Sequence, residues 1–257
     1  MKNHFHRAVI LAGMIGLAGC HKTDYSYSGS SIQDYMPLYV GHSITYQMDS
    51  ILYTHFGSVL ERHFYIVKDS IEGTVTDASD RPSWRMVRYF RDNADTTAWQ
   101  PGGTCMITPL RSTIEMVENN LRYVKLCMPV QDVYSWAGNG YLPFQPYSYA
   151  FDFGYSDHVQ LESWRYQYQD LYKKDTINQL VFDNTITVAC SRPDSSNFPP
   201  VDLALAGNKT VWVERYAKGV GLVYKDVILQ EYHPVSPSVT IPYYAGFELR
   251  MSIIAYQ

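Results

Sequence analysis

The sequence predicts a mainly β protein: a single antiparallel β domain, built as a curved sheet, a partial barrel or a sandwich, with at most one or two short helices. Three observations lead to this prediction. Short runs that alternate apolar and polar residues recur along the chain, and turn residues separate them. No window keeps a 3.6-residue apolar period over three turns. This combination is typical of antiparallel sheets.

The first residues have the pattern of a bacterial lipoprotein signal. Lys2 and Arg7 precede an apolar run over 8–19, which is shorter than the roughly 20 residues of a membrane-spanning helix. The run ends in Leu-Ala-Gly before Cys20, the order of a lipobox. We predict that residues 1–19 are removed and that the thiol of Cys20 carries the lipid, with acyl chains such as palmitate. The alternative is an ordinary signal peptide followed by a chance cysteine.

The predicted lipid would hold the protein on a membrane, because each buried CH₂ group contributes roughly 0.8 kcal/mol. Residues 20–34 are polar and indicate a flexible tether, and 35–257 indicate one β-rich domain. We expect attachment to the outer membrane. The residues after Cys20 leave open whether the protein faces the periplasm or the cell surface.

The charge balance excludes one class of partner. Removal of the signal leaves 19 of the 21 basic residues against 25 acidic ones, a net charge of −6. The chain has no basic tail or stripe. A nucleic-acid-binding face needs clustered basic residues, so we expect no nucleic acid partner.

The first predicted strands are defined by alternation. In 43–49, Ile44, Tyr46 and Met48 share one face of a strand. The segment 63–77 is rich in β-branched and aromatic residues, which favour strands. In 83–92, one face carries Trp84, Met86, Arg88 and Phe90.

The segment 111–130 indicates a hairpin that turns at 118–120, because its two asparagines tolerate positive φ. The segment 57–64 is the best helix candidate, and 191–200 is the clearest long loop. The remaining predicted strands are 158–172, 182–190, 209–217, 221–232 and 246–256.

The segment 216–226, YAKGVGLVYKD, resembles a phosphate-binding loop only superficially. Gly219 and Gly221 lack the third glycine of a dinucleotide fingerprint, and the residues after Gly221 alternate like a strand. No helix N-terminus is then available to an anion. We predict a connection between two antiparallel strands, in which the glycines supply positive φ or a bulge.

Aromatic residues gather in 134–155, where nine of 22 residues are Tyr, Trp or Phe. Such rings have an apolar body and, in Tyr and Trp, a polar edge, so they can stack on sugars or partner surfaces. The alternative, which we favour because aromatic residues are strand formers first, is that they form the core and rim of the β fold. The residues proposed as a partner or glycan surface are Tyr134, Trp136, Tyr141, Phe144, Tyr147 and Tyr149.

Three cysteines follow Cys20. A disulfide between Cys105 and Cys127 is conceivable in an envelope compartment. However, the predicted hairpin places Cys127 opposite residue 112 rather than 105, and a bridge needs the two Cα atoms within about 7 Å. That bridge would leave Cys190 as the spare thiol.

No residue pattern selects a reaction. No nucleophile elbow is present, no Cys–His pair is fixed by spacing, and the His and Glu pairs such as Glu61 with His63 lack a third ligand at a set distance. We therefore expect no catalytic residue, no metal and no cofactor. Four Asp-Ser or Asp-Thr sites resemble the O-glycosylation motif of Bacteroidota periplasmic proteins: Ser50, Ser70, Thr96 and Thr176.

Taken together, these segments resemble small cell-envelope lipoproteins of Bacteroidota, a group without an assigned activity. The resemblance begins with the pattern Y-x-P-L-x-x-G in 35–53 and ends with YAKGVGLVYKD and 246–257. It implies an envelope location and one β-rich domain, and it supplies no catalytic residue. The intervening segments that carry it are 80–91, 117–130, 136–141, 164–172 and 182–188.

We therefore favour a lipid-anchored, non-enzymatic binding or structural accessory that offers an aromatic surface to a glycan, a lipid or an envelope protein. A cupped sheet with an apolar inner face could also hold an acyl chain. One alternative is a hydrolase of envelope or dietary glycans, which needs two carboxylates about 5–5.5 Å apart for retention or 6.5–9.5 Å for inversion. The other is a structural subunit of an outer-membrane complex.

Overall fold

The protein is described by a computed structural model that covers residues 30–94, 96–154, 160–190 and 194–257. Its centre is one antiparallel sheet of 13 strands, ordered β6-β5-β4-β3-β2-β1-β13-β12-β11-β9-β8-β7, with β10 paired to β11 outside this path. This confirms the predicted mainly β fold. The strands are β1 (Ser43–Thr54), β2 (Val59–Thr76), β3 (Pro82–Asp92), β4 (Gln100–Pro109), β5 (Thr113–Glu118), β6 (Leu121–Cys127), β7 (Ser135–Trp136), β8 (Tyr166–Ile177), β9 (Leu180–Cys190), β10 (Asp194–Ser196), β11 (Gly207–Ala217), β12 (Gly221–His233) and β13 (Tyr243–Tyr256).

Helical structure in the described ranges is limited to three short elements: the 3₁₀ turns η1 (Ile32–Tyr35) and η2 (Leu161–Ser163), and the single-turn helix α1 (Ser148–Phe151). Cys20, the signal and most of the predicted tether lie outside the described residues. The described chain enters the fold beside the β11–β12 turn, where the amide of Gly219 donates to the carbonyl of Asp34 at 2.7 Å.

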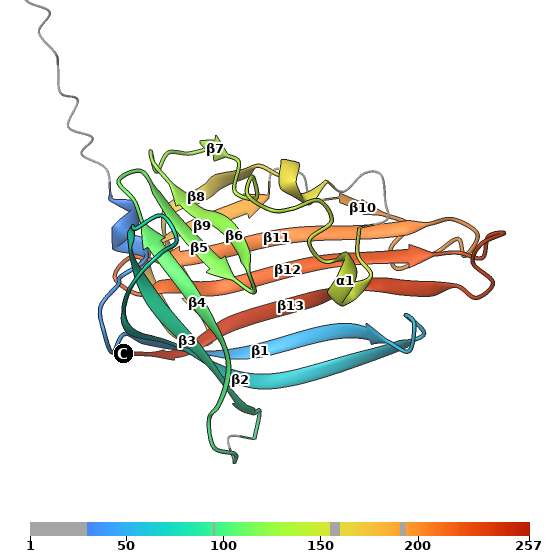
Figure 1. The fold of residues 1–257 in the computed structure, drawn as a ribbon, viewed down its shortest axis with the longest axis horizontal. Coiled ribbons are helices and arrows are strands. Elements are labelled where there is room, and N and C mark those ends of the chain that lie inside the picture. The colour runs from blue at the N-terminus through green and yellow to red at the C-terminus, as the bar shows by residue number, and fades with distance from the viewer. Residues whose placement is uncertain (1–29, 95, 155–159, 191–193) are drawn as a thin grey trace, which may run out of the picture.

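The sheet curls until its two ends meet. Strands β3 to β6 cross in front of the long strands β1, β13, β12 and β11 (Figure 1). The edge strand β6 then contacts β7 and the segment after it: the amide of Val124 donates to the carbonyl of Gly138, and the indole N–H of Trp136 donates to the carbonyl of Val124, each at 2.8 Å. The sheet is therefore nearly closed into a barrel, which covers an edge that would otherwise be free to pair.

Tyrosine, which is abundant in this chain, supplies a large part of the core. Five tyrosines are among the largest fully buried side chains. Each buried hydroxyl donates a hydrogen bond, as burial of a polar edge requires. The donors and acceptors are Tyr35 to Asn184, Tyr46 to the Leu222 carbonyl, Tyr166 to Asn139, Tyr168 to the Cys127 carbonyl and Tyr216 to Glu214.

The two predicted turns are confirmed. Asn119 and Asn120 join β5 to β6 with φ of 52° and 62°. Gly219 and Gly221 join β11 to β12 with φ of 76° and 107°. In both turns the left-handed backbone is supplied by residue types that tolerate it, so these segments connect strands.

Three predictions about elements are wrong. The segment 57–64 is not a helix: residues 55–57 have positive φ and turn β1 into β2, which starts at Val59. The predicted strand 158–172 starts only at Tyr166, after η2, and its residues 158 and 159 are outside the described ranges. The loop 191–200 contains the short strand β10. In addition, strand β4 is missing from the predicted strands, because its sequence does not alternate apolar and polar residues.

The structure does not join Cys105 to Cys127, and both are free thiols. Strand β5 lies between the strands that carry them, with Cys105 paired to Met86 and Cys127 to Thr113. The predicted register of the hairpin is off by one residue because a bulge follows Ile114.

Candidate functional site

Charged side chains lie inside the curled sheet, each on the inward-facing side of its own strand. On β3, Arg88 stands between Met86 and Phe90, and on β12 Lys225 stands between Val223 and Val227. The cluster has three positive and three negative side chains, and all of them line one interior cavity. They are Asp69, Arg88, Glu118, Lys125, Glu214 and Lys225.

Arg88 is the centre of one half of this ion cluster. Its guanidinium donates to both carboxylate oxygens of Asp69, at 2.7 and 2.8 Å, and also to Glu118. Burial would raise the pKa of Glu118, but Lys225 and Arg88 outweigh it and hold this pKa well below its usual range. Glu118 is therefore an anion at neutral pH.

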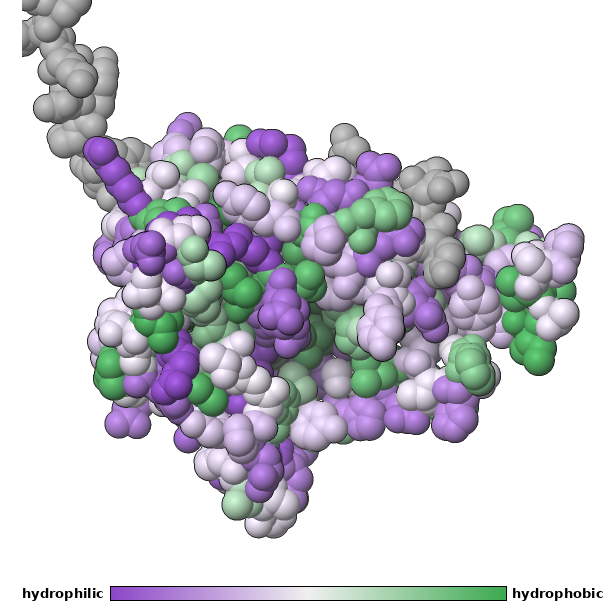
Figure 2. Space-filling model, viewed as in Figure 1, coloured by the Kyte–Doolittle hydropathy of each residue, from purple (hydrophilic) through white to green (hydrophobic). Residues whose placement is uncertain are grey.

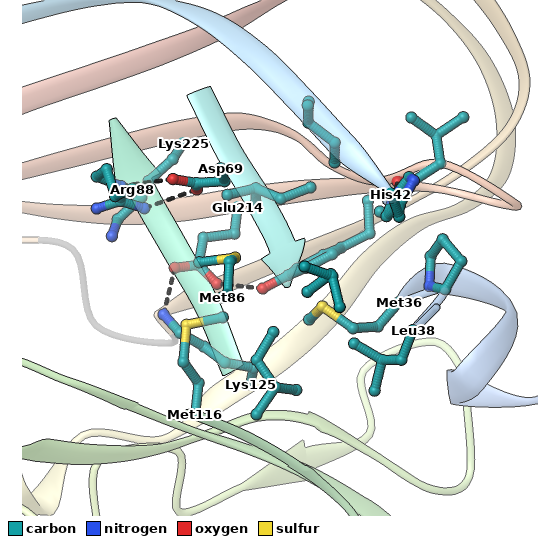
Figure 3. A pocket seen from close by; sticks show the side chains of 18 of the residues that line it. Met36, Leu38, His42, Asp69, Met86, Arg88, Met116, Lys125, Glu214 and Lys225 are labelled. Carbon is teal, nitrogen blue, oxygen red and sulfur yellow. Dashed lines mark hydrogen bonds and ion pairs between the residues drawn. The ribbon is translucent and has the colours of Figure 1, made fainter. Parts of the chain in front are cut away.

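Lys125 and Glu214 form the other half. The ammonium of Lys125 donates to Glu214 at 2.6 Å, and both side chains are almost fully buried. The hydroxyl of Tyr216 donates to the second carboxylate oxygen at 2.6 Å. Burial opposes ionisation of Glu214, yet Lys125 and Lys225 lower its pKa, so it too is ionised. Figure 3 shows this pair facing Arg88 and Asp69 across the cavity.

Lys225 differs from the other members of the cluster. It is 7% exposed. Its nearest carboxylate, Glu118, is 3.7 Å away, and its ammonium lies 5.9 Å from the ring centre of Trp212. Among the described residues, its closest ion-pair partner is this carboxylate, at a distance longer than a hydrogen bond. A lysine ammonium has three donors, so Lys225 can still bind an acceptor.

Two cavities share the residues Arg88, Glu118 and Lys225. The smaller, of about 50 Å³, is shown in Figure 3 and is lined on its other side by apolar side chains such as Met36, Leu38 and Met116. The larger has a volume of about 240 Å³. Figure 2 shows a hollow near the middle of the visible face, with hydrophobic residues at its base.

The larger cavity is lined by aromatic rings as well as by members of the ion cluster. Tyr147 and Phe151, in and next to α1, pack against Phe247 of β13 with ring centres 5.2 and 4.5 Å apart. The hydroxyl groups of Tyr147 and Tyr123 lie 2.6 Å from each other. The other apolar residues of the lining are Met48, Leu52, Phe90, Leu121, Trp212, Val227 and Leu249.

The aromatic residues predicted as a partner surface have three different locations. Tyr134 and Trp136 pack into the core, with Trp136 buried, and Tyr147 lines the larger cavity. The other three are exposed on the outside: Tyr141, Phe144 and Tyr149. The six therefore do not form one surface.

The predicted glycosylation sites differ in access. Ser50 lies within β1, is partly buried and lines the larger cavity, and Ser70 is partly buried in β2. Thr96 and Thr176 are exposed, in the β3–β4 connection and near the end of β8.

Metal-ligating side chains do not gather in the described part of the chain. Its residues contain no group of three or more His, Cys, Asp or Glu side chains suited to a metal ion. No helix in those ranges is both long and apolar enough to cross a membrane.

Sequence analysis missed the ion cluster, although a signal for it exists. Arg88 shares the apolar side of its strand with Met86, as alternation predicts. Glu214 stands in the same way between Trp212 and Tyr216. A charge on the apolar side of a predicted strand marks a side chain that the fold must pair inside.

Known proteins offer only distant likenesses. No protein-family model and no curated protein matches the chain. One similar solved structure is a candidate exported protein with a YmcC-like fold from Bacteroides fragilis, at 12% identity over 86% of this chain and 99% of that one. Another is a candidate lipoprotein from Parabacteroides distasonis, at 10% identity over 87% and 98%. The TM-score is 0.31 for each, so neither likeness supports an inference about function.

Proposed function

We propose that this chain is a lipid-anchored envelope protein that binds a small amphiphile inside its curled sheet. The ligand has an apolar body and a head group that accepts hydrogen bonds, with a carboxylate as the simplest case. The observation that carries the proposal is the cavity of about 240 Å³, which is lined both by aromatic rings and by the ammonium of Lys225.

The aromatic lining of the larger cavity favours a ligand with an apolar body. Phe151, Phe247 and Trp212 offer faces and edges of rings, and contact with an alkyl chain would remove apolar surface from water on both partners. Ligand sites in proteins are commonly of this kind, mostly apolar with a few placed polar groups.

Lys225 favours a ligand whose head group accepts hydrogen bonds. Arg88 and Lys125 are already bonded to carboxylates, whereas the ammonium of Lys225 is 3.7 Å from its nearest one. A buried ammonium without close acceptors gains more from a new acceptor than one that is already paired. Glu118 and Glu248 also line the cavity, so a cationic head group is the competing case that the pair of probes below tests.

The ionisation of the cluster supports binding over hydrolysis. A glycoside hydrolase needs a carboxylic acid that keeps its proton near neutral pH. Glu118 and Glu214 instead have lowered pKa values.

Isothermal titration of the chain from residue 21 onward tests the proposal, with decanoate and decylammonium as probes of equal length and opposite charge. We expect decanoate to bind and decylammonium to bind at least ten-fold more weakly. Lys225→Met keeps the length of the side chain and removes its donors, so it should weaken decanoate at least ten-fold. Absence of decanoate binding, or equal binding of both probes, would overturn the proposal.

Two further variants separate the cavity from the outer surface. Ser50→Phe places a ring in the larger cavity and should abolish decanoate binding. Tyr149→Ala removes a fully exposed ring and should leave binding unchanged. Circular dichroism and melting temperature of each variant show whether the fold is intact.

The lipid anchor has its own test. Growth with an alkyne-labelled palmitate should label the protein, and Cys20→Ala should abolish the label. Unchanged labelling of that variant would contradict attachment at Cys20.

A further inference from the structure

Large apolar side chains are exposed at one end of the sheet. They belong to the connections β1–β2, β10–β11 and β12–β13, which meet at the right-hand end of Figure 1. Figure 2 shows hydrophobic residues projecting there. We call this group the end loops. Its exposed members are Phe56 (96%), Val201 (94%), Ile241 (71%), Leu203 (67%), Val235 (61%) and Leu205 (57%).

Contacts around Tyr244 hold the end loops together. Its amide donates to the carbonyl of Gly57 at 2.9 Å, which joins the start of β13 to the β1–β2 turn. Its ring packs edge-on against Phe198, from the β10–β11 connection. The hydroxyl of Tyr232 donates to the carbonyl of Leu203 at 3.1 Å. The three connections therefore form one structured surface.

The β10–β11 connection holds its apolar side chains outward. It folds around the side chain of Asn197, which donates to the carbonyls of Asp202 and Leu205 at 2.9 and 3.0 Å and accepts from the amide of Val201 at 3.0 Å. These bonds satisfy the polar backbone from within the loop. The exposure of Val201, Leu203 and Leu205 is thus part of the folded state.

Composition identifies the occupant of this surface. Protein interfaces are enriched in aromatic residues, Met and Arg, and Leu and Val are under-represented among their strongest contacts. The exposed members here are Val, Leu, Ile and one Phe. The segments 54–58, 197–206 and 234–242 contain one charged residue, Asp202, and no Lys or Arg. Aliphatic loop tips without basic residues match the hydrocarbon of an uncharged bilayer better than a protein or an anionic surface.

Chain geometry places this surface far from the predicted anchor. The described chain enters beside the β11–β12 turn, at the opposite end of β12. With 13 residues at about 3.3 Å each, β12 separates the two ends by about 40 Å. Ten residues from Cys20 to Ser30 reach at most about 36 Å. The anchor and the end loops are therefore separate contacts at opposite ends.

We infer that the end loops insert into the hydrocarbon of a zwitterionic lipid bilayer. This contact is independent of the lipid on Cys20 and of the interior cavity. It gives the protein a second attachment to a membrane, through loop tips that reach below the head groups.

Flotation of the chain from residue 21 onward with phosphatidylcholine vesicles tests the inference, because this chain lacks the acyl group and retains every described residue. We expect the protein to float with the vesicles. The triple variant Val201→Asp, Leu203→Asp, Ile241→Asp should lower the bound fraction at least ten-fold. The matched control Tyr141→Asp, Phe144→Asp, Tyr149→Asp changes three exposed rings elsewhere and should still float.

Three results would overturn the inference. The first is that the unaltered chain does not float. The second is an equal loss of binding in both triple variants. The third is a dimer of the unaltered chain that only the end-loop variant abolishes, without vesicle binding, which would assign the surface to a second copy. Decanoate binding in the end-loop variant should be unchanged, so failure here is distinct from failure at the cavity.

Discussion

At the scale of residues, the ion cluster is the feature that most constrains the interior. Six charges inside a sheet are tolerated because Arg88 is shared by two carboxylates and Glu214 accepts from Lys125 and Tyr216. Removing one member of a buried pair leaves the other charged and without a partner, which costs more than the pair contributes.

Lys125→Met should lower the free energy of unfolding by about 3–5 kcal/mol, because it leaves the carboxylate of Glu214 buried without its ammonium. Adding Glu214→Gln should recover part of this loss. Lys174→Met is the matched control, since Lys174 and Asp183 form an exposed pair at 3.4 Å and such pairs contribute about 0–1 kcal/mol. Urea unfolding measures all three. Equal losses for Lys125→Met and Lys174→Met would contradict the buried pair.

The ion pair of Asp77 should make the stability of the folded protein depend on pH in the acidic range. The side-chain hydrogen bond from Arg81 is the main cause that lowers the pKa of Asp77 from 3.8 to about 2. Its contribution is complete above the unfolded pKa and is lost as pH falls through the folded one. The melting temperature of Asp77→Asn should therefore lie below that of the unaltered protein at pH 6, and the difference should shrink between pH 4 and pH 2. A constant difference over this range would exclude the effect.

At the scale of elements, alternation located most of the strands because one side of each strand packs inside. Prediction from alternation failed where glycine and proline take the place of alternating apolar and polar residues. Strand β4 starts Gln-Pro-Gly-Gly, and a Cβ on Gly102 would overlap with the ring of Phe90. The glycine is required by close packing between strands, but in the sequence it resembles a turn. The segment 57–64 failed for a related reason, because a tight turn at 55–57 reverses the chain where the expected helix would begin, and strand β2 follows from Val59.

Glycines inside strands give a prediction at this scale. Gly246 in β13 has φ of 93°, and a Cβ there would overlap with the carbonyl of Leu229 on β12. Gly246→Ala should therefore destabilise the protein by more than about 2 kcal/mol, through backbone strain and the clash. Gly73→Ala is the control, because a Cβ there meets nothing within 4 Å. Thermal unfolding compares the two, and similar losses would count against the role of Gly246.

At the scale of the whole molecule, the site could be predicted only in part. The sequence indicated an aromatic segment, and Tyr147 and Phe151 of that segment do line the cavity. It offered burial of these rings as an alternative, but it could not single out Trp136 or show that Lys225 and Arg88 line one cavity, because both depend on how far the sheet curls. Closure through Val124 and the segment after β7 joins residues distant in sequence, and alternation within one strand carries no information about it.

The three proposed functions are separate in space. The predicted anchor precedes one end of the sheet, the amphiphile site lies inside it, and the end loops lie at the other end. Each has its own variant: Cys20→Ala, Lys225→Met and the triple change at Val201, Leu203 and Ile241. We expect each variant to remove one property and to leave the other two.

A crystal structure of the protein with decanoate tests the proposed amphiphile site most directly. We predict the alkyl chain in the larger cavity, against Phe151 and Phe247, and a carboxylate oxygen about 2.7–2.9 Å from Nζ of Lys225. Decanoate located only on the exposed rings Tyr141, Phe144 and Tyr149, with the cavity unchanged, would contradict this site.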